Sequence, residues 1–120
     1  MRLLHVTAAL GGFASVALGA FGAHGLEAAL SAEGRDWWDT ASFYLLSHSL
    51  AALVCANASH DTNKRRAGWA FICGAFIFSG SLYAMALGAP RWLGAITPIG
   101  GVGLLLGWGL LAYGGLRGKG

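Results

Sequence analysis

One set of polar residues in this sequence has the types and spacing that could do chemistry inside a membrane. Thr40, Tyr44 and His48 recur every four residues, so on a helix they share one face. The surrounding segment is apolar, and hydroxyl or imidazole groups facing hydrocarbon would lack hydrogen-bond partners. We therefore expect this face to contact other helices and to form an intramembrane polar cluster with groups there. The candidate members are His24, Thr40, Tyr44, His48, Ser79, Ser81 and Tyr83.

Two interpretations of this cluster stay open. Its hydrogen bonds could serve only to fix helix packing, or His48 could line a pocket for a small molecule, a proton or a lipid headgroup. His24 would either bond the start of a neighbouring helix or close the outer mouth of that pocket. Haem ligation by His24 and His48 is disfavoured, because the helix rise separates them by ~10 Å in depth.

The sequence contains none of the motifs that signal an enzyme. We find no nucleophile elbow, phosphate loop, zinc-ligand spacing or carboxylate pair. No charged residue lies within the long apolar windows, although ion-coupled transporters usually carry one near the midplane. Cys55 and Cys73 have no CxxC spacing, and we expect both to be small buried side chains. We predict no catalytic residues, no metal and no cofactor.

The elements that must position the polar cluster are four long apolar windows. The chain has 120 residues, of which 56% are hydrophobic and 11% charged, a balance too apolar for a soluble domain of this size. Each window reaches the ~20 residues that cross a bilayer as a helix, and none shows the alternation of a membrane β-strand. The sequence predicts an all-α integral membrane protein, a four-helix transmembrane bundle forming one domain over 1–120. The predicted helices cover about 3–23, 39–59, 67–89 and 97–116.

Local signals predict how these helices begin and end. Leu26–Ala32 is amphipathic and predicts a short interfacial helix between the first two transmembrane helices, ended by Gly34. Asp36 is the expected N-cap of the second helix, and the paired Trp37 and Trp38 fit an interfacial aromatic belt. Thr97 and Pro98 are expected to be the N-cap and the first-turn proline of the fourth helix.

The distribution of basic residues predicts the topology. Arg35 and Arg91 lie beside one set of helix ends, and the six others lie beside the opposite set: Arg2, Lys64, Arg65, Arg66, Arg117 and Lys119. By the positive-inside rule, both termini are cytoplasmic in a multi-pass protein of a bacterial inner membrane. A cleavable signal is the alternative interpretation of the N-terminus, disfavoured because the apolar run is longer than a usual signal core. The sequence has no basic patch interleaved with aromatic residues, so we do not expect it to bind nucleic acid.

Small residues on the first helix suggest close packing. Gly11, Ser15, Gly19 and Ala23 follow each other at four-residue spacing and form a smooth stripe for another helix backbone. Similar stripes are expected on the third and fourth helices, at Gly80, Ala84, Gly88, Gly103 and Gly107. The leading functional hypothesis is thus a non-enzymatic membrane subunit or scaffold, with membrane lipid and a second copy or another membrane protein as partners. The alternative is binding or transport through a polar pocket around His48.

Four ordered motifs resemble a known family. They are Gly19-Ala20-Phe21-Gly22-Ala23-His24-Gly25-Leu26, then Trp38 with Thr40-Ala41, Tyr44 and His48, then Phe78-Ser79-Gly80-Ser81-Leu82-Tyr83, and Ile96-Thr97-Pro98-Ile99-Gly100-Gly101 before Gly107-Trp108. Over essentially its whole length the chain resembles the DUF 423 family, the bacterial relatives of vertebrate transmembrane protein 256. The resemblance implies a small inner-membrane protein with four helices and brings no established activity. Family members often have polar or aromatic residues where this chain has Leu45, Leu46 and Ser47, which would interrupt a polar relay along this helix.

Overall fold

The described part of the chain is helical throughout, apart from its turns. A computed structural model describes residues 2–58 and 60–118 and confirms the all-α class predicted from the continuous apolar windows. Ser59, the expected end of the second helix, and Lys119 lie outside the described residues. The elements are α1 (Arg2–His24), α2 (Ala32–Ala56), α3 (Thr62–Ala86), the 3₁₀-helix η1 (Arg91–Ala95) and α4 (Thr97–Leu116).

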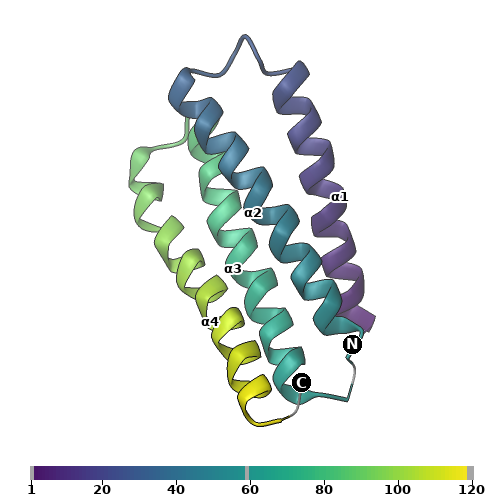
Figure 1. The fold of residues 1–120 in the computed structure, drawn as a ribbon. Helices are drawn as coiled ribbons and strands as arrows, with labels where there is room; N and C mark the ends of the chain where they lie inside the picture. The colour runs from purple at the N-terminus through teal and green to yellow at the C-terminus, as the bar shows by residue number, and fades with distance from the viewer. Residues whose placement is uncertain (1, 59, 119–120) are drawn as a thin grey trace.

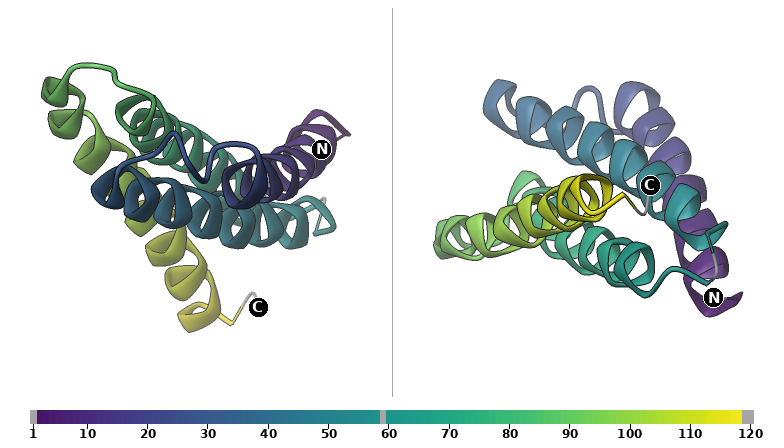
Figure 2. Two further views of the ribbon diagram at one scale, coloured as in Figure 1. Left: turned by 90° about the horizontal axis from the view of Figure 1, so that it is seen from above. Right: turned by 60° about the horizontal axis from the view of Figure 1, so that its bottom comes forward.

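The four α-helices form an open row and not a closed bundle. Extensive contacts join α1 to α2, α2 to α3 and α3 to α4, while α1 touches α3 only slightly. Neighbouring helices run antiparallel, and α1 and α4 lie at opposite ends of the row (Figures 1 and 2). The short connections explain this order, because they keep each helix beside the next one in sequence. The outer sides of α1 and α4 are consequently left without a helical neighbour.

The surface left by this open row is strongly apolar. α1, α3 and the segment Arg91–Leu116 are long and apolar enough to cross a membrane. α2 falls outside this group: its first two turns carry Glu33, Arg35, Asp36 and Asp39, and polar side chains, among them His48, follow within its apolar part. Beyond those turns its exposed face is also apolar, and it consists of Phe43, Leu46, Leu50 and Val54. Large exposed hydrophobic side chains on all four helices are the surface expected of a protein whose solvent is lipid.

The connection between α1 and α2 differs from the prediction. The interfacial helix expected over Leu26–Ala32 is wrong, because Leu26–Leu30 forms one turn in which the amides of Ala29 and Leu30 both donate to the Leu26 carbonyl. α2 begins directly afterwards, where the Ser31 hydroxyl accepts from the Gly34 amide at 2.9 Å and caps the helix. Asp36 therefore lies inside the helix, and Gly34 belongs to the first turn of α2 instead of ending another helix.

The connection between α3 and α4 contains the short helix that the first connection lacks. Gly88 adopts a φ of 104°, which favours glycine, and it turns the chain from α3 toward η1. Pro98 lies in the first turn of α4, but Thr97 is no side-chain cap. Its hydroxyl instead bonds the Ser81 hydroxyl at 2.6 Å, which fastens the start of α4 to α3.

The small residues of α1 pack against α2 along a line that differs from the predicted stripe. Gly11 and Ser15 are buried, Gly19 is half-buried and Ala23 is exposed, because a spacing of four residues drifts by ~40° per step around a helix of 3.6 residues per turn. The contact continues instead to Gly22, which lies directly against the Trp38 indole. Trp38 is consequently buried and donates to the Leu18 carbonyl at 2.7 Å, so it is not a belt residue.

Glycines also bring α3 and α4 together. Gly74 of α3 faces Gly100 and Gly103 of α4, and a Cβ on Gly74 would lie 2.8 Å from the Gly100 carbonyl oxygen. Of the stripes expected on these helices, Gly103 and Gly107 take part in this contact. Gly80 does not, since a Cβ there would have no atom within 4 Å.

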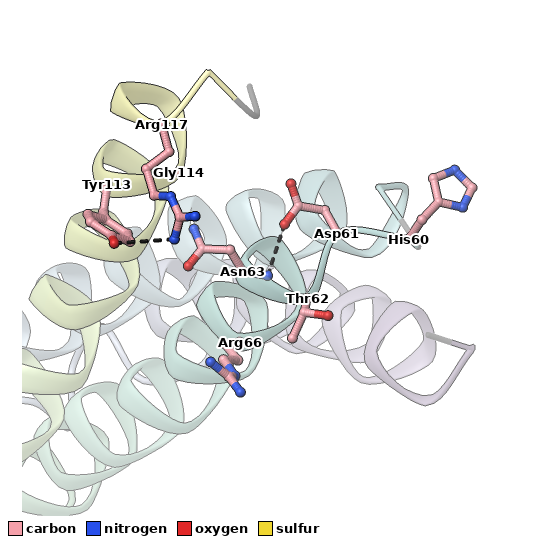
Figure 3. A pocket seen from close by; sticks show the side chains of 8 residues that line it. All are labelled: His60, Asp61, Thr62, Asn63, Arg66, Tyr113, Gly114 and Arg117. Carbon is pink, nitrogen blue, oxygen red and sulfur yellow. Dashed lines mark hydrogen bonds between the residues drawn. The ribbon is translucent and has the colours of Figure 1, made fainter.

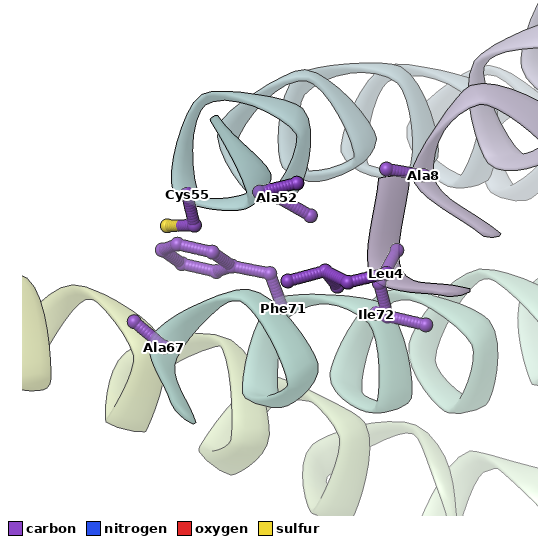
Figure 4. Close-up of a cluster of buried hydrophobic side chains, with 8 residues drawn as sticks. Leu4, Ala8, Ala52, Cys55, Ala67, Phe71 and Ile72 are labelled. Carbon is purple, nitrogen blue, oxygen red and sulfur yellow. The ribbon is translucent and has the colours of Figure 1, made fainter. Parts of the chain in front are cut away.

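A hydrophobic core joins the start of α1, the end of α2 and the start of α3. Phe71 lies at its centre, and Figure 4 shows its ring beside Cys55 and Leu4. The other buried members are Ala8, Ala52, Ala56, Ala67 and Ile72. Cys55 is buried as expected, whereas the prediction for Cys73 is wrong, because this side chain is exposed on α3.

Candidate functional site

His48 is the centre of the polar residues inside the helical row. It is 7% exposed, and both of its ring nitrogens have partners. Its Nε2 accepts a hydrogen bond from the Trp108 indole at 3.0 Å, so its Nδ1 carries the proton of the neutral ring. That Nδ1–H donates to the Tyr44 carbonyl at 2.9 Å, with the Ser47 hydroxyl at 3.1 Å. The two bonds fix one tautomer of a neutral imidazole and join α2 to α4.

Packing around Phe71 places Trp108 against His48. The Phe71 ring lies edge-on to Trp108, with centroids 4.8 Å apart, and 5.6 Å from the His48 ring. Gly107 makes this approach possible, because a Cβ there would lie 2.5 Å from the Phe71 ring. Because Gly107 has no side chain, α4 packs closely against α3. The indole of the next residue, Trp108, can then contact His48 of α2.

A groove of about 560 Å³ lies beside this hydrogen bond, between α2 and α4, with Phe78 of α3 forming part of its wall. Three of its side chains are polar, namely Tyr44, Ser47 and His48, and the others are apolar apart from the Trp108 indole. The α4 side consists of Pro98, Gly101, Val102, Leu104, Leu105 and Trp108. Leu105 is 72% exposed, so the groove opens on the apolar outer surface of the protein. His48 therefore does two things at once: its nitrogens are paired, and its ring lines a groove.

Tyr44 is the polar group of the groove that remains available. Its ring stacks on His48 with centroids 5.6 Å apart and an angle of 5°, and it packs on Phe78 at 4.6 Å. Among the residues that the structure describes, the Tyr44 hydroxyl has no hydrogen-bond partner. An unpaired hydroxyl is costly in a region without water, because it has given up hydration without a replacement.

The remaining members of the predicted cluster are distributed over separate contacts. The Ser79 hydroxyl donates to the Ala41 carbonyl at 2.7 Å, and the Tyr83 hydroxyl bonds Ser42 at 2.7 Å, so both join α3 to α2. Ser81 points the other way and bonds Thr97 of α4. His24 and Thr40 are exposed and lie outside all of these contacts. The structure thus keeps Tyr44 and His48 together and assigns the serines and Tyr83 to helix packing.

Several residues of these contacts were not among the sequence candidates. Trp108 had a usable signal, because an indole N–H in an apolar helix needs an acceptor inside the protein. Ser42 and Thr97 had weaker signals, since a hydroxyl can bond its own helix and needs no partner elsewhere. Ser49 is buried against Gly11 and has no hydrogen-bond partner among the described residues. In the same part of the chain, no three side chains of His, Cys, Asp or Glu come together as a metal site would require.

Comparison with known proteins agrees with the helical, apolar architecture. The model of the family described as protein of unknown function DUF423 matches residues 18–101. The chain belongs to the DUF423 family. Its relatives include a UPF0382 membrane protein of Staphylococcus epidermidis, 44% identical over 119 residues and 98% of each chain. Another is a UPF0382 membrane protein of Haemophilus influenzae, 45% identical over 113 residues, covering 92% of this chain and 91% of the relative.

A further DUF423 relative carries a more specific name. The UPF0382 inner membrane protein YgdD of Escherichia coli K12 is 40% identical over 119 residues, covering 97% of this chain and 91% of the relative. No solved structure matches the chain. The family and its relatives establish a membrane protein of uncharacterised role, in agreement with the exposed apolar helices.

Proposed function

We propose that this DUF423 protein binds a lipid-soluble ligand with a hydrogen-bonding head group in the groove between α2 and α4. The observation that carries the proposal is the unpaired Tyr44 hydroxyl at a groove with apolar walls. The hydrocarbon of a bilayer supplies no hydrogen-bond partner for such a group, and a ligand alcohol or carbonyl would supply one. The apolar walls would hold the hydrocarbon part of the same molecule.

The role is binding and not catalysis or proton transfer. Catalytic bases need a free lone pair, and the Nε2 lone pair of His48 is occupied by the Trp108 indole. No carboxylate or ammonium group lines the groove to act with it. The His48–Trp108 bond instead keeps the two helices that form the groove at a fixed separation.

The proposal places the protein in the inner membrane with four crossings and both termini cytoplasmic. The name of the E. coli relative, an inner membrane protein, supports this membrane. The antiparallel row puts the start of α1, the start of α3 and the end of α4 at one end (Figure 1), and Arg2, Arg66 and Arg117 lie in or beside these helix ends. α2 would cross with the part that follows its charged first turns, residues 40–56, whose large exposed side chains are apolar. The outer end then carries most of the acidic residues.

A second candidate function is association with another copy or another membrane protein. The predicted stripe does not support it, because Gly11 and Ser15 pack within the chain. Gly12 and Gly109 support it better, since a Cβ at either position would meet no atom within 4 Å. Glycines without an internal packing role leave room for a helix of a second chain.

A photoreactive long-chain alcohol tests the groove. The full chain in phosphatidylcholine nanodiscs is irradiated with a hexadecanol that bears a diazirine, and the adducts are mapped by peptide mass spectrometry. We expect adducts on Ser47, Val102 and Leu105. Tyr44→Phe removes one hydrogen bond of ~1 kcal/mol and should lower the groove adducts about fivefold.

Two leucine substitutions on α4 form the matched pair. Gly101 lines the groove, and a Cβ there would make ordinary contact with the Phe78 ring at 3.9 Å, so Gly101→Leu places its side chain in the groove and should abolish the adducts. Gly109→Leu adds the same volume outside the groove and should leave them unchanged. Equal labelling of groove and α1 residues such as Phe13, unaffected by Gly101→Leu, would refute the proposal.

A further inference from the structure

A second groove lies at the end of the molecule where the chain begins and ends. It measures about 490 Å³ and lies between the start of α3 and the end of α4 (Figure 3). Unlike the groove beside His48, it is lined mainly by polar and charged groups. The lining residues are His60, Asp61, Thr62, Asn63, Arg66, Tyr113, Gly114 and Arg117.

The cationic groups of this groove have donors to spare. Arg66 has no ion-pair or hydrogen-bond partner among the residues that the structure describes. Arg117 lies over the Tyr113 ring, 5.5 Å from its centroid, and donates from one nitrogen to the Tyr113 hydroxyl at 3.3 Å. A guanidinium has five N–H donors, so most of those on Arg117 remain available.

Among the lining residues, Asp61 supplies the carboxylate, and one of its oxygens is already hydrogen-bonded to backbone amides. Asp61 caps α3, and one of its oxygens accepts from the amides of Asn63 at 2.9 Å and Lys64 at 3.1 Å. Figure 3 shows His60 directed away from the other lining side chains. Two arginines against one acid leave the lining with an excess positive charge, and Arg65 adds to it from the neighbouring surface.

The floor of the groove is fixed in shape. The Asn63 side-chain amide donates to the Leu110 carbonyl and so holds the first turn of α3 against α4. Gly114 allows this approach, because a Cβ there would lie 2.6 Å from the same amide nitrogen. The positions of the two arginine backbones are therefore set by the packing of the helices that carry them.

We propose that this groove binds the phosphodiester headgroup of an anionic phospholipid from the adjacent membrane leaflet. Basic pockets between transmembrane helices recognise such headgroups by charge and by guanidinium–phosphate hydrogen bonds. Free phosphate offers the same chemistry. The lipid is favoured because Leu116, next to Arg117, is 87% exposed and Tyr113 is 54% exposed, so apolar surface for acyl chains adjoins the charges.

Native mass spectrometry of the full chain in a neutral detergent tests the site. The protein is titrated with dioleoylphosphatidylglycerol and, separately, with dioleoylphosphatidylcholine. Each basic side chain should contribute about fivefold to the affinity for an anionic lipid. The double variant, Arg66→Gln with Arg117→Gln, should therefore bind phosphatidylglycerol about 25-fold more weakly and phosphatidylcholine as before. Both side chains are exposed, so the double variant should elute and fold as the wild type does.

Arg65→Gln is the matched control, because Arg65 is exposed on the same helix turn but does not line the groove. It should change phosphatidylglycerol binding less than twofold. A loss of about fivefold in the control, the same per side chain as in the double variant, would overturn the proposal in favour of diffuse surface charge. Millimolar inorganic phosphate is added in a competing arm: displacement of the lipid would overturn the lipid as the source of the phosphate group, and retention of the lipid would support it.

Discussion

The contact between α3 and α4 gives the sharpest prediction, and Gly100→Ala is the substitution that tests it. A Cβ on Gly100 would lie 2.7 Å from the Gly74 carbonyl oxygen and 2.8 Å from the Phe78 Cα, and it would also press on the Phe78 amide nitrogen. All three are backbone atoms, which cannot rotate away as a side chain can. Ordinary contact begins at 3.4 Å, so relieving the contact with the Gly74 oxygen alone needs 3.4 − 2.7 = 0.7 Å, and the helices must separate by at least this much.

This separation sets the magnitude of the effect. Overpacking of a close contact costs ~1–3 kcal/mol, and the upper end applies because backbone must move. Alanine recovers up to ~1 kcal/mol through its helix propensity. We expect Gly100→Ala to lower the free energy of unfolding by ~2 kcal/mol, which is about 30-fold in the unfolding equilibrium.

Reversible unfolding by sodium dodecyl sulfate in mixed micelles, followed by circular dichroism, measures this free energy. Gly101→Ala is the matched control on the next residue, since its Cβ would meet only the Phe78 ring at an ordinary 3.9 Å. The control should be neutral or slightly stabilising. If the two variants unfold within ~0.5 kcal/mol of each other, α3 and α4 do not cross at Gly74 and Gly100, and the reasoning fails.

Three further outcomes follow from single side chains. Trp108→Phe leaves the His48 Nε2 without its donor and should cost ~1 kcal/mol in the same unfolding titration, whereas an unchanged value would contradict the α2–α4 hydrogen bond. Ser49→Ala removes a buried hydroxyl that has no partner among the described residues and should stabilise the protein by ~1 kcal/mol; a loss of stability would show that the hydroxyl is bonded. A spin label on Cys73, in a Cys55→Ala background, should collide with lipid-dissolved oxygen and not with a water-soluble nickel chelate, because this side chain is exposed on α3. Strong collision with the chelate would place it in water.

The sequence was a good guide to the helices and a poorer guide to their ends. Long apolar windows can only be satisfied as helices in a bilayer, and the bounds of α1 and α4 lie within one residue of the predicted ranges. α3 was predicted over 67–89 but runs from Thr62 to Ala86, because Asp61 caps it ahead of the apolar window. The start of α2 was misplaced because Asp36 was expected to cap it. Ser31 caps the helix instead, since its hydroxyl accepts from the Gly34 amide, and α2 therefore begins within the segment Leu26–Ala32 that was predicted to form a separate helix.

The packing and the groove were harder to predict because they depend on how residues of different helices meet. A four-residue stripe matches a helix only over a short distance, so Gly11 and Ser15 face α2 while Ala23 has turned away. The polar face of α2 is likewise divided, because Tyr44 and His48 line the groove, whereas Thr40 lies outside its lining and is exposed. Whether His48 would be paired depended on Trp108, 60 residues away, and on Gly107 letting that indole past Phe71. That combination is a property of three helices together. With both nitrogens of His48 hydrogen-bonded, the Tyr44 hydroxyl is the groove's polar group without a partner among the described residues. A ligand for this groove should therefore be recognised at Tyr44 and not at the histidine.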